Sequence, residues 1–256
     1  MEQICCGPNN RQPMSGVRKA YFARLVGRCL LFCVCIYLWI RHPMAFDILH
    51  GMNFFDRFSF LHIMWVIWVI DMICQLVPMG KKVSLGSHKL FKQRFKPILE
   101  KVNYTALREY ISTTTKSAYK VMLLWLGLAA AIAGLYYTKI INRITMFMIT
   151  AAFSICDLIC VLIWCPFRLL MKTRCCTTCR IFNWDHLMMF TPMIFVKSFY
   201  SWSLFFMALL VFAVWELFVL MYPERFWEHS NDALKCANCT DKLCTQYCRK
   251  LTQKQI

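Results

Sequence analysis

An aspartate followed three positions later by a cysteine occurs twice in strongly apolar surroundings. The two copies are Asp71 with Cys74, in residues 58–78, and Asp157 with Cys160, in residues 144–169. Each segment is long enough to cross a bilayer, which takes about 20 apolar residues. A carboxylate at that depth costs about 3 kcal/mol or more unless a partner compensates it, a proton neutralises it or it faces a cavity. These residues are therefore candidates for an ion-binding or transport site.

The spacing of each pair also suggests a chemistry. Residues three positions apart share one face of a helix, so the carboxyl and the thiol converge. A carboxylate beside a thiolate suits borderline cations such as Zn²⁺, whereas a carboxyl group alone suits proton transfer. Glu216, in the last apolar segment, is a third candidate acid. Two alternatives stay open: the cysteines are apolar filling of the helices, and the acids form structural ion pairs, such as Glu216 with Lys197.

The composition indicates a membrane protein. Hydrophobic residues make up 59% of the chain and charged residues 17%, against about 45–50% and 25% in soluble domains. The net charge of +17 lies mainly in the segments between apolar stretches. Short basic loops stay on the cytoplasmic side, which predicts a cell or inner membrane and a cytoplasmic N-terminus. Because anionic lipid headgroups account for the basic charge, we expect no nucleic-acid partner.

We predict an all-α fold: a polytopic transmembrane helical bundle of five to six spans, arranged as helical hairpins, with an amphipathic interfacial helix and a small cysteine-rich tail. The predicted parts are a first hairpin (1–78), a basic cytoplasmic or interfacial segment (79–117), a second hairpin (118–169), a cysteine-containing cytoplasmic loop (170–185), a third hairpin or broken span (186–222) and the C-terminal tail (223–256). The amphipathic helix is expected around residues 90–102, where Pro97 kinks it or marks its start.

The number of spans depends on residues 186–222, which Pro192 and Lys197 interrupt. A short broken inbound helix (186–200) followed by a full span (201–222) gives six spans and a cytoplasmic tail. An interfacial segment followed by a single crossing gives five spans and the opposite side for the tail. We favour six, because the basic tail and its cysteines then share a compartment with the other basic segments.

Further ionisable residues lie in or beside the apolar segments, and three of them are singled out here. Arg28 is inside the first apolar stretch, and Asp185 and His186 stand at the start of the broken segment. We expect Asp185 and His186 to cap a helix start. The alternative is a polar pair at the mouth of the bundle.

Six cysteines outside the apolar segments are the candidate metal ligands: Cys176, Cys179, Cys236, Cys239, Cys244 and Cys248. A C-x2-C turn directs two sulfurs to one metal, and two such turns complete the tetrahedral coordination of zinc. The first candidate is therefore Cys176 and Cys179 facing Cys236 and Cys239. An iron–sulfur cluster on the tail cysteines, thiol–disulfide exchange at Cys176 and Cys179, and palmitoylation next to the membrane remain open alternatives.

These features predict an integral membrane protein that binds or passes a cation or proton through its intramembrane acids and carries a cytoplasmic thiolate metal module. The alternatives are a membrane thiol–disulfide or iron–sulfur redox protein, and a metal-stabilised scaffold that binds a protein partner. The sequence contains no phosphate-binding glycine loop, nucleophile elbow or H-E-x-x-H motif. These are the motifs that would assign phosphate, esterase or metalloprotease chemistry.

Overall fold

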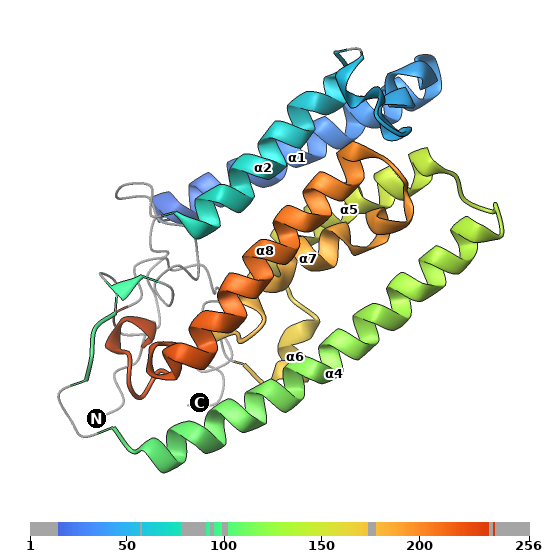
Figure 1. Ribbon diagram of the computed structural model, residues 1–256. Coiled ribbons are helices and arrows are strands. Elements are labelled where there is room, and N and C mark those ends of the chain that lie inside the picture. The colour runs from blue at the N-terminus through green and yellow to red at the C-terminus, as the bar shows by residue number, and fades with distance from the viewer. Residues whose placement is uncertain are drawn as a thin grey trace, which may run out of the picture.

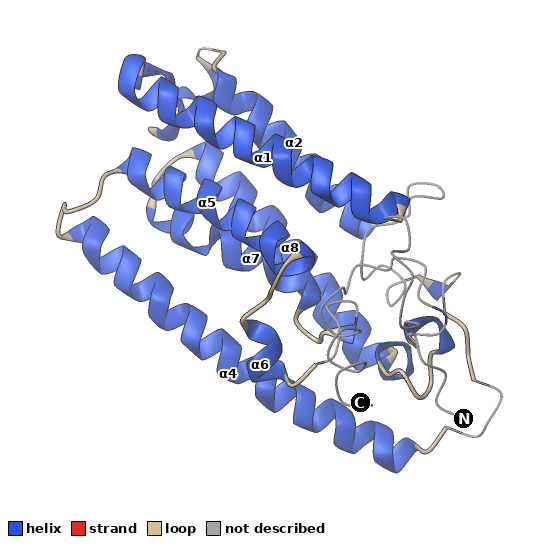
Figure 2. Cartoon of the chain, turned by 180° about the vertical axis from the view of Figure 1, so that it is seen from behind, coloured by secondary structure: helices blue, strands red, loops and turns tan. Residues whose placement is uncertain are grey.

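The computed structural model describes residues 15–56, 58–77, 91–92, 95–98, 102–173, 178–235 and 238. It is an elongated bundle of helices (Figure 1), and the described residues contain no β-strand (Figure 2). Four helices are long and apolar enough to cross a membrane: α1 (Gly16–Arg41), α4 (Tyr104–Tyr137), α5 (Arg143–Leu162) and α8 (Phe199–Met221). The predicted class, an all-α chain with membrane-spanning helices, agrees with this arrangement.

Two shorter apolar elements lie among the long helices. One is α2 (Phe60–Leu76), which packs against α8 and contacts α1 through Met64 and Cys35. The other is α7 (Asp185–Phe190), which continues as the 3-10 helix η6 (Thr191–Phe195) and runs beside α8 (Figure 1). The interruption predicted at Pro192 is present, because proline lacks an N–H and cannot continue the α-helical hydrogen bonds.

Each of the four long helices, and α2 as well, starts after a residue whose side chain accepts a backbone N–H of the first turn. These N-caps are Ser15, Ser59, Asn103, Asn142 and Ser198. Such caps satisfy amide groups that have no partner within the helix. Prolines follow two of the helices: Pro43 starts η1 (Pro43–Leu49) after α1, and Pro223 starts η7 (Pro223–Phe226) after α8.

The helices of the predicted second hairpin have bounds that differ from those of the predicted spans. α4 begins at Tyr104, well before residue 118, because Asn103 caps a continuous helix there. α5 ends at Leu162 rather than near residue 169, and the chain becomes helical again only in α6 (Phe167–Met171). Pro166 explains this break, since a proline removes the N–H that the helix needs and disfavours helical geometry in the residue before it.

The amphipathic helix predicted around residues 90–102 is not formed at residues 95–98. The Ile98 amide donates to the Ser230 carbonyl (3.3 Å), and the Lys96 carbonyl accepts from the Asp232 amide (2.8 Å). Pro97 lies opposite Asn231 in an isolated bridge. The backbone here binds the segment after α8 instead of itself. Most of the remaining predicted helix lies outside the described residues.

The core is divided along the bundle. A large cluster, which includes Trp68, Phe147 and Tyr200, fills the end formed by η1 and the first halves of α2, α5 and α8. At the opposite end, one cluster surrounds Trp184 and Trp215, and a smaller one joins α1 to the last turns of α5. Charged side chains lie between the first cluster and the other two.

Candidate functional site

The three acids selected from the sequence occupy equivalent positions on three helices. Asp71, Asp157 and Glu216 each stand five residues before the last residue of α2, α5 and α8, respectively. At a rise of 1.5 Å per residue, each carboxylate therefore lies about 7.5 Å from its helix end. All three helices run toward the end of the bundle where α1 begins (Figure 1). The acids therefore lie at similar distances from that end, and we call them and their arginine partners the charged layer.

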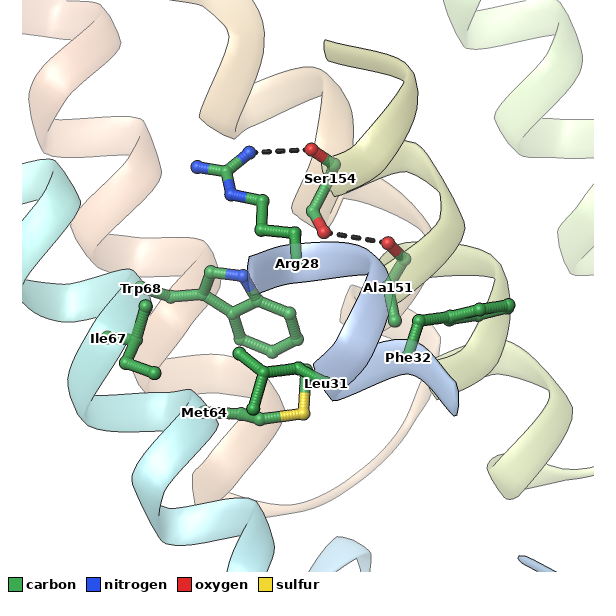
Figure 3. A pocket seen from close by; sticks show the side chains of 8 residues that line it. All are labelled: Arg28, Leu31, Phe32, Met64, Ile67, Trp68, Ala151 and Ser154. Atoms are coloured by element: carbon green, nitrogen blue, oxygen red, sulfur yellow. Dashed lines mark hydrogen bonds between the residues drawn. The ribbon is translucent and has the colours of Figure 1, made fainter. Parts of the chain in front are cut away.

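Arg28 of α1 joins the first two acids. Its guanidinium donates to Asp71 Oδ2 at 2.7 Å and lies 3.5 Å from Asp157 Oδ2. It also donates to the Ser154 carbonyl at 2.6 Å (Figure 3). The Arg28 side chain is only 11% exposed. One buried arginine therefore compensates carboxylates from two different helices.

The compensation of the two carboxylates is unequal. Asp71 has the short bond to Arg28 and a second arginine, Arg24, at 3.9 Å. Asp157 has only the longer contact with Arg28 among the ion pairs of the described residues. Since Coulomb attraction falls with distance, Asp157 is the less strongly held acid.

Glu216 forms a separate ion pair with Arg180, which lies in the connection before α7. The guanidinium donates to both carboxylate oxygens, at 2.7 and 2.6 Å, and Trp184 Nε1 donates to Glu216 Oε1 at 2.8 Å. The Arg180 carbonyl accepts from Trp215 Nε1 at 2.9 Å, which fixes the arginine against α8. Such two-bond arginine–carboxylate pairs are strong and geometrically specific.

The ion pair suggested between Glu216 and Lys197 is wrong. Lys197 lies at the opposite end of α8, where its carbonyl accepts from the Gly51 amide at 3.1 Å. Gly51 has φ +51°, a left-handed geometry that glycine adopts without strain, and its own carbonyl accepts from Phe199. These bonds join the connection after α1 to the start of α8.

Asp185 and His186 do not cap α7. Trp184 is the N-cap residue, and no side chain caps that end. Instead His186 Nδ1 lies 3.2 Å from Asp185 Oδ1, and Gln75 of α2 contacts both residues at 3.1 Å. The alternative, a polar pair at this end of the bundle, is therefore the arrangement present.

A small cavity lies beside the Arg28 guanidinium, on the side away from the helix ends. Its volume is about 10 Å³, which is near the lower limit for one ordered water molecule. Arg28 and Ser154 supply its polar wall, and Met64, Trp68 and Ala151 lie on the apolar side (Figure 3). A water molecule here would contact the guanidinium that both aspartates share.

The two cysteines of the repeated pattern have different surroundings. Cys74 is half-buried one turn after Asp71. Cys160 hydrogen-bonds to Cys165, which lies in the connection after α5. This hydrogen bond is the largest of the influences that lower the pKa of Cys165 to about 7, and backbone amides of Arg168 and Phe167 and the Arg168 charge act in the same direction. Partial burial opposes them.

Most of the predicted metal ligands lie outside the described residues: Cys176, Cys236, Cys239, Cys244 and Cys248. Cys179 is described and buried, and it packs in the cluster around Trp184 and Trp215. Within the described ranges no group of three or more histidine, cysteine, aspartate or glutamate side chains could hold a metal ion. The zinc and iron–sulfur predictions thus remain untested at their own residues.

Sequence reasoning selected the three acids but missed their partners. The available signal for Arg28 was its place as a base inside an apolar stretch, since such residues commonly pair with acids in neighbouring spans. Arg180 had no such signal, because it belongs to a basic connection. Gln75 was also overlooked, although a polar amide one turn after Asp71 lies on nearly the same helix face.

The four long apolar helices define a class, the helical proteins with helices long and apolar enough to cross a membrane. No family model, no curated protein and no solved structure matches this chain. Its function must therefore be argued from the site itself.

Proposed function

We propose that this chain is an integral membrane transporter that moves a proton or small cation through Asp157, with Asp71 and Arg28 as the other members of the site. The observation that carries the proposal is the unequal sharing of one buried guanidinium by two carboxylates. An ionised acid with incomplete compensation in a poorly solvated site favours a proton or a bound cation. Asp157 is that acid.

Because both aspartates share the Arg28 guanidinium, binding of a proton or cation at Asp157 can change how the helices are held together. When Asp157 is ionised, Arg28 bridges α2 and α5 through both carboxylates. When a proton or cation neutralises Asp157, Arg28 binds Asp71 alone and its attraction to α5 weakens. Because Arg28 belongs to α1, which packs along α5, neutralisation changes the balance between two arrangements of these helices, as alternating access requires.

The proposal includes six crossings in three helical pairs, with α2 and the α7–η6 segment crossing beside the four longer helices. α2 has 17 residues and a length of about 25 Å, close to the hydrocarbon thickness of a bilayer. Both chain ends then lie on the cytoplasmic side, where basic residues meet anionic headgroups. The equivalent positions of the acids on α2, α5 and α8 support this arrangement.

We expect Asp157→Asn to reduce proton or cation flux to the level of protein-free liposomes. Asn keeps the size of the side chain but binds neither a proton nor a cation at neutral pH. Full-length protein would be reconstituted with a trapped pH-sensitive dye, and the potential would be clamped with potassium and valinomycin. Parallel experiments would impose sodium or potassium gradients. Asp71→Asn should also lower the flux, because Arg28 would then bind Asp157 permanently.

Each single substitution leaves Arg28 one carboxylate, so both variants should fold. Glu109→Gln, which removes an exposed acid near the start of α4, is the matched control and should transport like the wild type. Wild-type flux in Asp157→Asn contradicts the proposal. So does a wild-type protein whose proton and cation fluxes equal those of protein-free liposomes.

We also propose that the loop and tail cysteines bind zinc and stabilise the end of the bundle near the charged layer. Two features support this. Cys179 packs in the same cluster as Phe226 of η7. Asn238, between Cys236 and Cys239 in the sequence, donates to Asp232 Oδ2 at 2.6 Å, and Asp232 binds Lys96 through its amide. Cys179 and Asn238, the described residues next to the proposed ligands, therefore lie at the same end of the bundle.

Metal analysis of the purified full-length protein should find about one zinc ion per chain, as expected for one four-thiolate site. Cys239→Ser should lose the zinc, whereas Cys156→Ser, which changes an exposed cysteine of α5, should retain it. Visible absorption with bound iron would favour the iron–sulfur alternative. Purified protein with neither metal would contradict a metal module.

A further inference from the structure

The last turn of α5 brings two cysteines together. The amides of Ile163 and Trp164 both donate to the Ile159 carbonyl, at 2.8 and 3.1 Å. The second bond spans five residues, which widens the turn relative to an α-helix. Cys165 follows directly, so its sulfur lies over the preceding turn and hydrogen-bonds to the Cys160 thiol.

The surroundings of this pair favour a thiolate on Cys165. Backbone amides of Phe167 and Arg168 hydrogen-bond to its sulfur, and the Arg168 side chain adds a positive charge. The Cys160 thiol donates a further hydrogen bond to the Cys165 sulfur. These contacts lower the pKa of Cys165 to about 7, whereas a free cysteine has a pKa of about 8.5. Both cysteines are half-buried rather than enclosed.

We propose that Cys160 and Cys165 form a redox-active dithiol that exchanges with small disulfides of the glutathione class. The Cys165 thiolate attacks one sulfur of the small disulfide, whose S–S bond breaks and releases a first thiolate. The Cys160 sulfur gives up its proton and attacks Cys165 in the mixed disulfide, which releases a second thiolate. Two cysteine thiols are oxidised, one small disulfide is reduced to two thiols, and the two cysteine protons go to those thiols.

This site is separate from the transport proposal, which uses neither sulfur. It is also separate from the C-x-x-C motif at Cys176 and Cys179. Cys160 and Cys165 come together because the end of α5 is distorted. They do not form a C-x-x-C motif, since four residues separate them in the sequence. Thiols that exchange with disulfides need a thiolate, a resolving partner and access for the reagent. Cys165 supplies the first through its lowered pKa and Cys160 supplies the second, and both lie half-buried at or just beyond the last turn of α5, where the proposal places the entry of the reagent.

The test uses the full-length protein in membranes, equilibrated with oxidised and reduced glutathione, alkylated and digested with trypsin. Cleavage after Arg143 and Arg168 gives one peptide, residues 144–168, with three cysteines: Cys156, Cys160 and Cys165. The reduced protein should carry three alkyl groups on this peptide. The oxidised protein should carry one, on Cys156, and reductant should restore the other two.

Three single substitutions test the roles of the attacking and the resolving cysteine. Cys160→Ser should stop at a mixed disulfide, so that the peptide gains one glutathione on Cys165. Cys165→Ser should form neither that adduct nor an internal disulfide. Cys156→Ser, the matched control on the same helix, should still lose two alkyl groups on oxidation. Three alkyl groups on the wild-type peptide throughout the glutathione range would overturn the proposal, as would a disulfide that joins Cys156 instead.

Discussion

Replacing Arg28 with methionine is expected to lower the free energy of unfolding by about 3–5 kcal/mol, the usual cost of removing one partner from a buried ion pair. The physical reason is that Asp71 and Asp157 both remain ionisable in poorly solvated positions while their shared guanidinium is lost. The loss would be measured by denaturant titration in detergent micelles, with thermal unfolding followed by size exclusion as a second readout.

Further variants distinguish the effect of unpaired charges from the effect of lost side-chain packing. Arg28→Met combined with Asp71→Asn and Asp157→Asn should regain most of the lost stability, because no unpaired charge remains. Arg24→Gln is the control: its side chain is 52% exposed, so the change should cost less than about 1 kcal/mol. If Arg28→Met were no more harmful than Arg24→Gln, the shared guanidinium would not stabilise the layer.

The second large effect is expected at the Arg180–Glu216 pair. Arg180→Met should destabilise the protein by about 2–3 kcal/mol, below the usual range for buried pairs. Glu216 is 27% exposed and keeps its bond from Trp184, which limits the loss. Removing the other partner with Glu216→Gln should destabilise the protein by a similar amount. The Arg180 side chain is only 5% exposed, so a buried guanidinium would then lack a carboxylate.

A double-mutant cycle is the direct measurement for this pair. The double variant Arg180→Met with Glu216→Gln should be more stable than the sum of the single effects predicts, since it leaves no unpaired charge. Glu109→Gln again serves as the exposed-acid control. Additive single effects would show that the two side chains do not stabilise each other.

These experiments also distinguish transport from a purely structural layer. Arg180 and Glu216 are joined by two bonds with short distances, which is the geometry of a fixed ion pair. Asp157 has one longer contact with an arginine that Asp71 holds more closely. We therefore expect Glu216→Gln to affect stability more than flux per folded protein, and Asp157→Asn to affect flux more than stability.

The sequence by itself determined the class and the positions of the acids. Long apolar runs are a local property, so they predicted membrane-length helices without any knowledge of packing. The cost of an ionised group among apolar residues identified Asp71, Asp157 and Glu216 for the same reason. The break at Pro192 was likewise local, because it follows from the missing N–H of proline.

Only the tertiary structure decided which groups compensate those acids. Arg28 is 43 residues from Asp71 and 129 from Asp157 in the sequence, and Arg180 is 36 from Glu216. Lys197 is nearer to Glu216 along the chain but lies at the other end of α8. The contact between Cys160 and Cys165 also required the structure, because it depends on how the last turn of α5 unwinds. Ion pairing and thiol contacts depend on separation in space, which sequence spacing specifies only within one continuous helix.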